Sequence, residues 1–285
     1  MRKLNVAIAF FSLLIAHSDN AYAGAWVQPK GRSLHIMKYY FYTTDDQFEG
    51  YGDLDSLPND GRFTKNEINY YVEVGATDKL TLIGNFFYDF LKYKDDFVTN
   101  TNNGFSDQEI GARYNIISSP VVFSVQGSFI FPAYSSDDAL KGNSPPEDEP
   151  ALGNQDIGLE ARLLLGKGFM LLGIPAYTNL EAGVRFRIGD PSDQIRYQTL
   201  FGIKPGGWEI MLFIDGIEGL RNEDEVVFSE NVTVIPDFSL IKGTVAVVIP
   251  IYKNRVSLEL GGFWHLLGRN TGGGGGVESG IWLRF

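Results

Sequence analysis

The chain has 285 residues, and its formal net charge of −11 excludes the basic surface that nucleic-acid binding requires. It has no cysteine, which excludes disulfide bonds and a lipid-anchored N-terminal cysteine. Glycine, phenylalanine and tyrosine are abundant, with 33, 21 and 14 residues. Beyond the N-terminus no apolar run is long enough for a transmembrane helix, so a membrane protein of this sequence would cross the bilayer as β-strands.

The N-terminus has the pattern of a secretory signal peptide. Arg2 and Lys3 precede an apolar run over residues 4–16, and Ala21-Tyr22-Ala23 forms a small-x-small cleavage site. The apolar run is too short to span a bilayer as a helix. We therefore predict a signal peptide over residues 1–23 and one domain over residues 24–285.

The rest of the chain contains segments of about ten residues in which polar and apolar residues alternate. This pattern is typical of transmembrane β-barrel strands, and no helical periodicity of useful length competes with it. The twelve predicted strands are residues 32–42, 63–75, 80–91, 106–117, 121–132, 155–165, 177–188, 194–204, 208–219, 238–249, 255–266 and 276–285.

The connections between these segments alternate between short and long, except for residues 189–193, which form a short connection where a long one is due. Outer-membrane barrels have short periplasmic turns and long extracellular loops, whereas a soluble β-sandwich has no reason for this asymmetry. An even strand number places both termini on the periplasmic side. The sequence predicts an all-β fold: a single antiparallel transmembrane β-barrel of about 12 strands, located in the outer membrane.

The last ten residues form a strand of this kind. Val277, Ile281 and Phe285 fall on one face, and Glu278 and Trp282 fall on the other. A closed barrel needs its last strand to pair with its first. This segment resembles the C-terminal strand of bacterial outer-membrane proteins, which implies that Phe285 is an assembly signal and that the barrel-assembly machinery is a partner.

The polar faces of three predicted strands carry Glu-x-Gly-x-Arg or a close variant. The residues are Glu109 with Arg113, Glu160 with Arg162, and Glu181 with Arg185; Glu259 begins a partial fourth copy. By alternation the same face also holds Lys65, Glu67, Glu73, Asp89, Asp156, Arg187, Arg196, Lys204, Glu209, Asp215, Lys242, Glu278 and Arg284. We predict that these charged side chains line the lumen.

The predicted lumen charges number nine basic and eleven acidic groups. This near balance indicates cross-strand ion pairs rather than a filter of one sign. The pairs could form a scaffold of salt bridges or line a path for solutes, and the two roles are compatible.

Catalytic and metal sites find little support. His35 and His265 are the only histidines outside the signal peptide, and they fall near opposite ends of the predicted barrel. Asp53-Leu54-Asp55 lacks the later ligand and glycine of a calcium loop, and residues 272–276 lack the Lys-Ser/Thr of a phosphate loop. We predict no catalytic residue, no metal site and no cofactor.

The predicted long loops are acidic, with clusters at residues 45–60, 137–149 and 223–225. These clusters suit a solvated surface. They could also hold divalent cations that bridge to anionic lipopolysaccharide, or attract cations to a pore mouth.

Short motifs resemble a family of Gram-negative outer-membrane barrels that includes the XagA-like proteins and porins named after the MetA phenol-degradation pathway. They are Gly24-Ala25-Trp26-x-Gln28-Pro29-Lys30-Gly31, Glu73-x-Gly75-x-Thr77-Asp78-x-Leu80-Thr81 and the Glu-x-Gly-x-Arg copies. The resemblance implies transport of small molecules or a role near exopolysaccharide export, and it supplies no catalytic residue. Unlike fatty-acid transporters, the chain is expected to lack an N-terminal hatch, because only about eight residues precede the first strand.

The sequence therefore predicts an outer-membrane channel or transporter for small solutes, with outer-membrane lipid and lipopolysaccharide as its surroundings. Two alternatives stay open: a non-conducting scaffold at the cell surface or near exopolysaccharide, and an outer-membrane lipid-modifying enzyme. A twelve-stranded barrel lies between small filled barrels and wide porins, so its lumen could be narrow or plugged by a loop.

Overall fold

The computed structural model describes residues 24–139, 149–189, 191–221, 237–253 and 255–285. The predicted signal peptide lies outside these residues and stays a prediction. Within the described ranges, no helix is long and apolar enough to cross a membrane.

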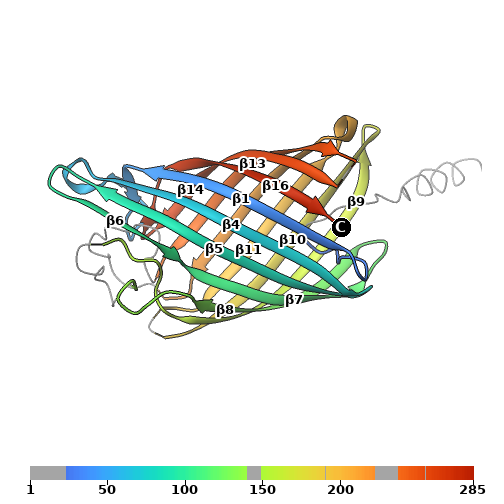
Figure 1. Cartoon of the computed structure of the whole chain (residues 1–285), viewed down its shortest axis with the longest axis horizontal. Helices are drawn as coiled ribbons and strands as arrows, with labels where there is room; N and C mark the ends of the chain where they lie inside the picture. The colour runs from blue at the N-terminus through green and yellow to red at the C-terminus, as the bar shows by residue number, and fades with distance from the viewer. Residues whose placement is uncertain (1–23, 140–148, 190, 222–236, 254) are drawn as a thin grey trace, which may run out of the picture.

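The described chain forms a closed antiparallel barrel of twelve strands (Figure 1), which confirms the predicted fold. In ring order the strands are β1 (Ser33–Thr44), β4 (Arg62–Thr77), β5 (Leu80–Lys94), β7 (Asp107–Ile117), β8 (Val122–Pro132), β9 (Ile157–Leu171), β10 (Ile174–Ile188), β11 (Gln194–Ile203), β12 (Glu209–Gly219), β13 (Ser239–Tyr252), β14 (Val256–Arg269) and β16 (Gly275–Arg284). Each overlaps one predicted segment. Alternation identified them because a barrel strand has one face toward lipid and one toward the lumen.

The barrel closes between its first and last strands. β16 pairs antiparallel with β1, from Leu34 opposite Arg284 to Thr43 opposite Gly275. The backbone amides of Ser33 and Phe285 each donate to the other residue's carbonyl at 3.0 Å. Phe285 itself projects outward and contacts the His35 ring at 5.5 Å. Its role as an assembly signal stays a prediction.

Several strands are longer than predicted. The expected connection over residues 166–176 is a two-residue turn, because β9 and β10 continue until Leu171 pairs with Ile174. Leu172 and Gly173 have φ of 50° and 83°, the positive values that a type I′ hairpin turn needs. The expected loop over residues 92–105 is also wrong in part, since β6 (Thr99–Phe105) pairs back onto the end of β5.

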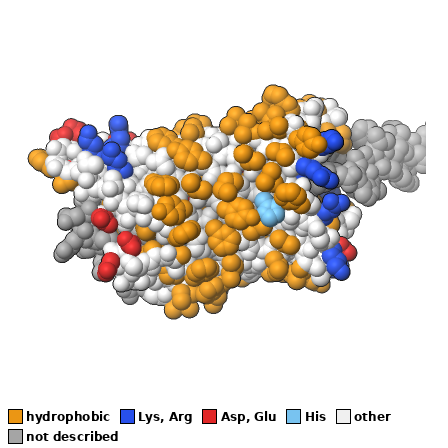
Figure 2. Space-filling model, in the orientation of Figure 1, with side chains coloured by type: hydrophobic (Ala, Val, Ile, Leu, Met, Phe, Trp, Pro, Cys, Tyr) orange, Lys and Arg blue, Asp and Glu red, His pale blue; other side chains and the backbone are white. Residues whose placement is uncertain are grey.

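The outer wall is apolar, as a lipid-facing surface must be. Met37, Leu82, Phe186 and Val277 are each at least half exposed on it. On the face that Figure 2 shows, hydrophobic side chains cover the middle of the barrel and the Lys, Arg, Asp and Glu side chains lie toward its two ends. We name the two ends of the barrel by their connections. The turn end has the short connections, and β1 begins and β16 ends there, at Ser33 and Phe285. The loop end has the long connections.

Short elements cover part of the loop end. β2 (Asp46–Phe48), β3 (Leu54–Ser56) and β15 (Thr271–Gly272) form a small second sheet, followed by the 3₁₀ turn η1 (Pro58–Asp60). At the turn end, a second 3₁₀ turn, η2 (Pro205–Gly207), joins β11 to β12.

Candidate functional site: a charged lumen

Nine of the twenty charged residues predicted for the lumen, those of the Glu-x-Gly-x-Arg copies with Arg187 and Arg196, lie on the inward face of their strands. Arg113, Glu160 and Glu259 are almost completely buried, and the other six are half-buried. Six of the nine line a cavity of about 550 Å³ inside the barrel, which we call the central cavity. They are Glu109, Arg113, Arg162, Glu181, Arg185 and Arg196. Glu160, Glu259 and Arg187 do not line it and form ion pairs elsewhere on the inner wall.

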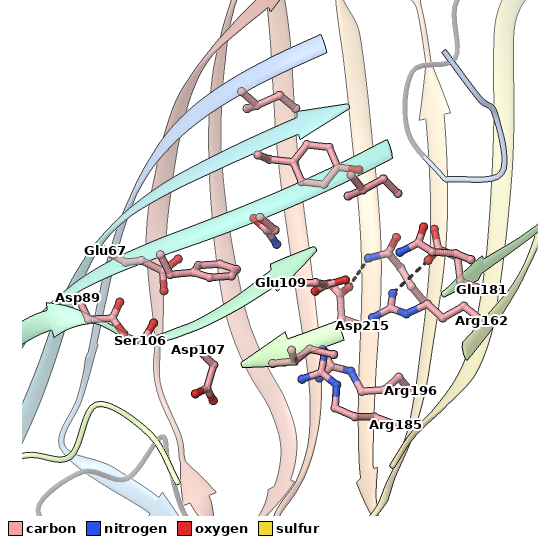
Figure 3. A pocket seen from close by; sticks show the side chains of 18 of the residues that line it. Glu67, Asp89, Ser106, Asp107, Glu109, Arg162, Glu181, Arg185, Arg196 and Asp215 are labelled. Carbon is pink, nitrogen blue, oxygen red and sulfur yellow. Dashed lines mark hydrogen bonds and ion pairs between the residues drawn. The ribbon is translucent and has the colours of Figure 1, made fainter. Parts of the chain in front are cut away.

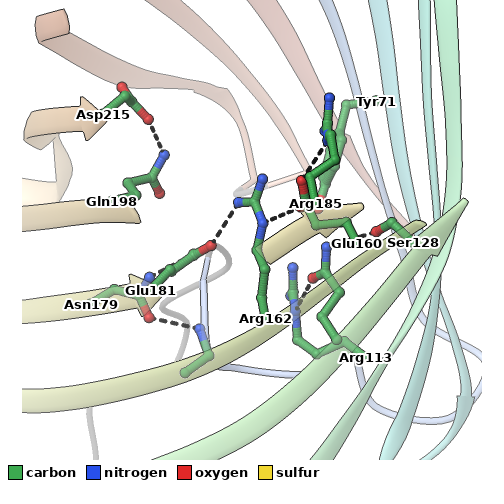
Figure 4. Close-up of polar contacts among 12 residues, drawn as sticks. Tyr71, Arg113, Ser128, Glu160, Arg162, Asn179, Glu181, Arg185, Gln198 and Asp215 are labelled. Atoms are coloured by element: carbon green, nitrogen blue, oxygen red, sulfur yellow. Dashed lines mark hydrogen bonds and ion pairs between the residues drawn. The ribbon is translucent and has the colours of Figure 1, made fainter. Parts of the chain in front are cut away.

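An ion-pair chain runs across β9 and β10 (Figure 4). Glu160 accepts hydrogen bonds from Arg162 and from Arg185 Nε, the latter at 2.8 Å. Arg162 Nη1 also donates to Glu181 at 3.2 Å. The pairs therefore form between neighbouring strands and within β9, and Arg185 binds Glu160 rather than the Glu181 of its own motif. The motif glycine serves this packing, because a Cβ at Gly183 would lie 2.6 Å from Arg162 Cγ.

A second cluster contains a lysine that the sequence did not reveal. Lys38 Nζ lies 2.8 Å from Glu259 and 3.6 Å from Glu278. Trp282 Nε1 also donates to Glu259 at 2.6 Å. The alternation pattern did not place Lys38 in the lumen, because its neighbours on the same face of β1, Ile36 and Tyr40, are an apolar and an aromatic residue.

Arg113 and Glu73 form a pair that is almost wholly buried, with 2.9 Å between Nη1 and Oε1. The Tyr71 hydroxyl donates to the same carboxylate at 2.6 Å, and Gln28 Nε2 donates to it at 2.7 Å. Arg113 also donates to Gln126 and to the carbonyl of Trp26. The partner of Arg113 is thus Glu73 of β4 rather than Glu109 of its own motif, and both residues bind the N-terminal segment.

Residues 24–30, which we call the N-terminal strap, enter the lumen at the turn end. The Ala25 amide donates to Asn179 at 2.8 Å, and Ser124 donates to the Ala25 carbonyl at 2.5 Å. Farther along, the Gln28 amide donates to Thr81 at 2.7 Å. The strap is therefore anchored successively on β10, β8 and β5.

Side-chain packing holds the strap as well. The Trp26 ring meets Tyr177 edge-on at 5.9 Å between centroids, and a Cβ at Gly166 would lie 2.7 Å from the same ring. A Cβ at Gly75 would overlap the Pro29 carbonyl. The sequence predicts no N-terminal hatch, because only about eight residues lie between the predicted cleavage site and the first strand. Residues 24–30 nevertheless cross part of the lumen.

Apolar side chains fill the rest of the turn end. This buried cluster joins Leu34, Ile36, Tyr177, Leu200, Met211, Ala246, Val248 and Trp282, with Trp26 of the strap packed against it. Together the strap and this cluster separate the central cavity from the turn end.

The loop end is narrowed by a second buried cluster, which combines Tyr42, Leu57, Phe63, Leu91, Tyr93, Leu152 and Phe263. Leu57 and Leu152 come from the connections β3–β4 and β8–β9, so these connections reach inward. The Pro150 carbonyl accepts a hydrogen bond from Asn102 at 3.1 Å, which ties the second connection to β6.

Acidic groups at the loop end keep their negative charge. The Arg62 guanidinium binds Asp45 through two hydrogen bonds of 2.5 and 2.6 Å, and this lowers the pKa of the Asp45 carboxyl. The amides of Val98 and Phe97 each donate to Asp95 at 2.7 Å and lower its pKa. Both groups therefore stay ionised below the usual aspartate pKa of about 3.9.

The two histidines face opposite sides of the barrel wall. His35 is on the outer face, where its Nδ1 and the Tyr70 hydroxyl share a hydrogen bond of 2.7 Å. His265 faces the lumen, stacks on Tyr42 at 4.9 Å and donates from Nδ1 to the Gly272 carbonyl at 2.7 Å. In the part of the chain that the structure describes, no three His, Cys, Asp or Glu side chains group as metal ligands.

Comparison with known proteins identifies the fold. An outer membrane channel from Pseudomonas putida F1 superposes with a TM-score of 0.67 at 12% identity, over 94% of this chain and 100% of that one. The β domain of the Bordetella autotransporter BrkA gives 0.50 at 9% identity, over 90% and 100%. No family model and no curated protein matches the sequence, so the resemblance to the XagA-like proteins stays a prediction. The closed barrel, its apolar outer band and these similarities make the protein an outer-membrane β-barrel.

Proposed function

We propose that the protein is a narrow outer-membrane channel for small polar solutes, closed at rest on its turn end by the N-terminal strap. One observation carries this proposal: the barrel encloses a polar cavity of about 550 Å³ lined by charged side chains. Small barrels have interiors just wide enough for side chains to fill, whereas this lumen keeps an open space of the size of a small solute.

The closure at the turn end supports gating rather than permanent sealing. The strap is one short segment, and its described contacts with the wall are side-chain and backbone hydrogen bonds together with the packing of Trp26. Moving it requires no strand to leave the barrel. The alternative, a non-conducting scaffold, is favoured by the two apolar clusters that narrow both ends of the lumen.

Two further features of the proposal concern the cell envelope. Insertion by the barrel-assembly machinery would read the outward Phe285, and lipopolysaccharide would surround the loop end. Transport as implied by the XagA-like resemblance fits the same channel. No catalytic residue is proposed, and the lipid-modifying alternative has no support from the arrangement of His35 or His265.

In planar bilayers the purified protein should give small, intermittent single-channel currents with a modest preference for cations. The acidic groups at the loop end raise the local cation concentration, and salt screens this effect over about 10 Å at 0.1 M. The preference should therefore fade at high salt. Neutralising Asp137, Asp138 and Glu149 should weaken it. Glu147 and Asp148 belong to the same predicted cluster and lie outside the described residues.

A folded protein that passes no current at any salt concentration, with or without its strap, would favour the scaffold. A clear anion preference would reject the contribution of the loop-end acids and leave the channel itself standing.

A further inference from the structure

The central cavity has one wall with clustered cationic groups and another with clustered anionic groups. The cationic wall is formed by three arginines. Arg162, Arg185 and Arg196 project into the cavity from β9, β10 and β11 (Figure 3). They lie close together because Gly183 stands opposite Arg162 on one side and opposite Arg196 on the other. Glu160 and Glu181 pair with Arg162 and Arg185.

Arg196 is the exception in this group. In the described chain it forms no hydrogen bond and no ion pair with another residue, although it is half-buried beside two other guanidinium groups. The Glu160 and Glu109 carboxylates act on it only through space, and a guanidinium without a hydrogen-bonded anion in such a place is costly. Its fork of N–H donors matches the two oxygens of a carboxylate.

The facing wall is anionic. Glu67, Asp89, Asp107 and Glu109 project from β4, β5 and β7, and Lys65 is the cation that pairs with Glu67 and Asp89, at 2.8 and 3.0 Å. Among the described residues, Glu109 has neither a hydrogen bond nor an ion pair, and Asp89 Oδ1 accepts none. Glu109 is close enough to interact electrostatically with both Arg162 and Arg196.

We propose that the central cavity binds small zwitterions, such as amino acids and short peptides, with the carboxylate at Arg196 and the ammonium group at Glu109. This inference rests on the proposed function, since it names the class of solute that the channel would admit. A solute with both charges satisfies the two unpaired groups at once. A simple anion would meet the acidic wall, and a simple cation would meet the three arginines.

The dimensions of the cavity suit such a solute. A volume of about 550 Å³ falls within the range of roughly 300–1,000 Å³ that is usual for small-molecule sites. A second space of about 460 Å³ shares Lys65, Glu67, Arg162, Arg196, Gln198 and Asp215 with it, so the cavity continues toward Tyr40, Tyr42 and His265. A dipeptide can therefore lie across the lumen between the two walls.

Isothermal titration calorimetry on the detergent-solubilised full-length barrel tests this with three matched probes. Ala-Ala carries both charges, N-acetyl-Ala-Ala keeps only the carboxylate, and Ala-Ala-amide keeps only the ammonium group. Ala-Ala should bind, and each blocked probe should bind about tenfold more weakly or worse, because each loses one charge-assisted pair.

Two variants assign the ends of the ligand. In Arg196→Gln the affinities for Ala-Ala and Ala-Ala-amide should become equal, and in Glu109→Gln those for Ala-Ala and N-acetyl-Ala-Ala should become equal. Neither change removes an ion pair of the described structure, so both proteins should keep the heat-modifiable mobility of a folded barrel. Arg255→Gln, at the exposed turn-end rim, should bind like the wild type.

The outcomes separate this inference from the proposed function. Equal binding of all three probes, or no binding of Ala-Ala to a protein that conducts ions, would overturn the zwitterion site and leave the channel. Selective binding of Ala-Ala to a protein that never conducts would overturn the channel and leave the site.

Discussion

Deleting residues 24–29 should raise the single-channel conductance severalfold and lengthen the open time. The expectation follows from the position of the N-terminal strap, which crosses the turn end of the lumen and is anchored on Thr81, Ser124 and Asn179. Removing it leaves the turn end closed only by the apolar cluster on the opposite wall. Planar-bilayer recordings of the purified deletion protein and the full chain, in the same salt, provide the measurement.

A point variant tests the same idea without shortening the chain. Gly75→Ala places a methyl group against the Pro29 carbonyl and should displace the strap. Gly127→Ala is the matched control, because its new methyl group points to the outer face and meets nothing nearer than 4.0 Å. Conductance that rises in Gly75→Ala and not in Gly127→Ala supports gating by the strap; equal conductance in the deletion protein and the full chain would contradict it.

Replacing Arg113 with methionine should destabilise the folded barrel by about 3–5 kcal/mol, because it leaves the Glu73 carboxylate buried without its cation. Glu73 is 1% exposed, and its other described partners, Tyr71 and Gln28, are neutral donors. The loss should appear as a lower urea midpoint for the heat-modifiable, folded form. Since Arg113 also holds the Trp26 carbonyl, the strap should loosen in the same variant.

The double variant Arg113→Met/Glu73→Met should recover most of this loss, since it removes the stranded charge together with its partner. Arg62→Met is the exposed comparison: it breaks the Asp45 pair in water, where ion pairs contribute little. Equal stability of Arg113→Met and the wild type would show that the buried pair does not hold the turn end together.

The barrel could be predicted from the sequence because each strand has one lipid face and one lumen face. Apolar and polar residues therefore alternate with a period of two in every strand. The same rule placed Arg162, Arg185 and Glu160 on the inner face. It could not say which residues meet, because ion pairs depend on the register between strands. The partner of Arg113 lies on β4, two strands away from β7, with β5 between them.

The closure of the lumen by the N-terminal strap could not be predicted from the sequence, for a different reason. The N-terminal strap is too short to show a period, and its anchors are scattered over three strands. A signal did exist in the inward glycines: Gly75 and Gly166 leave room where the strap approaches the wall. Lys38 was missed because its face of β1 is otherwise apolar, and the unpaired state of Arg196 emerges only when every neighbour is placed.

The central claim, that solute passes through the charged lumen, is tested most directly by cysteine accessibility, since the chain has no cysteine of its own. Gln198 lines both inner spaces, and the next residue, Thr199, is exposed on the outer face. A membrane-impermeant, positively charged methanethiosulfonate reagent should reduce the current through Gln198→Cys and leave the current through Thr199→Cys unchanged. Unchanged current through Gln198→Cys, after mass spectrometry has shown complete modification, would contradict the account.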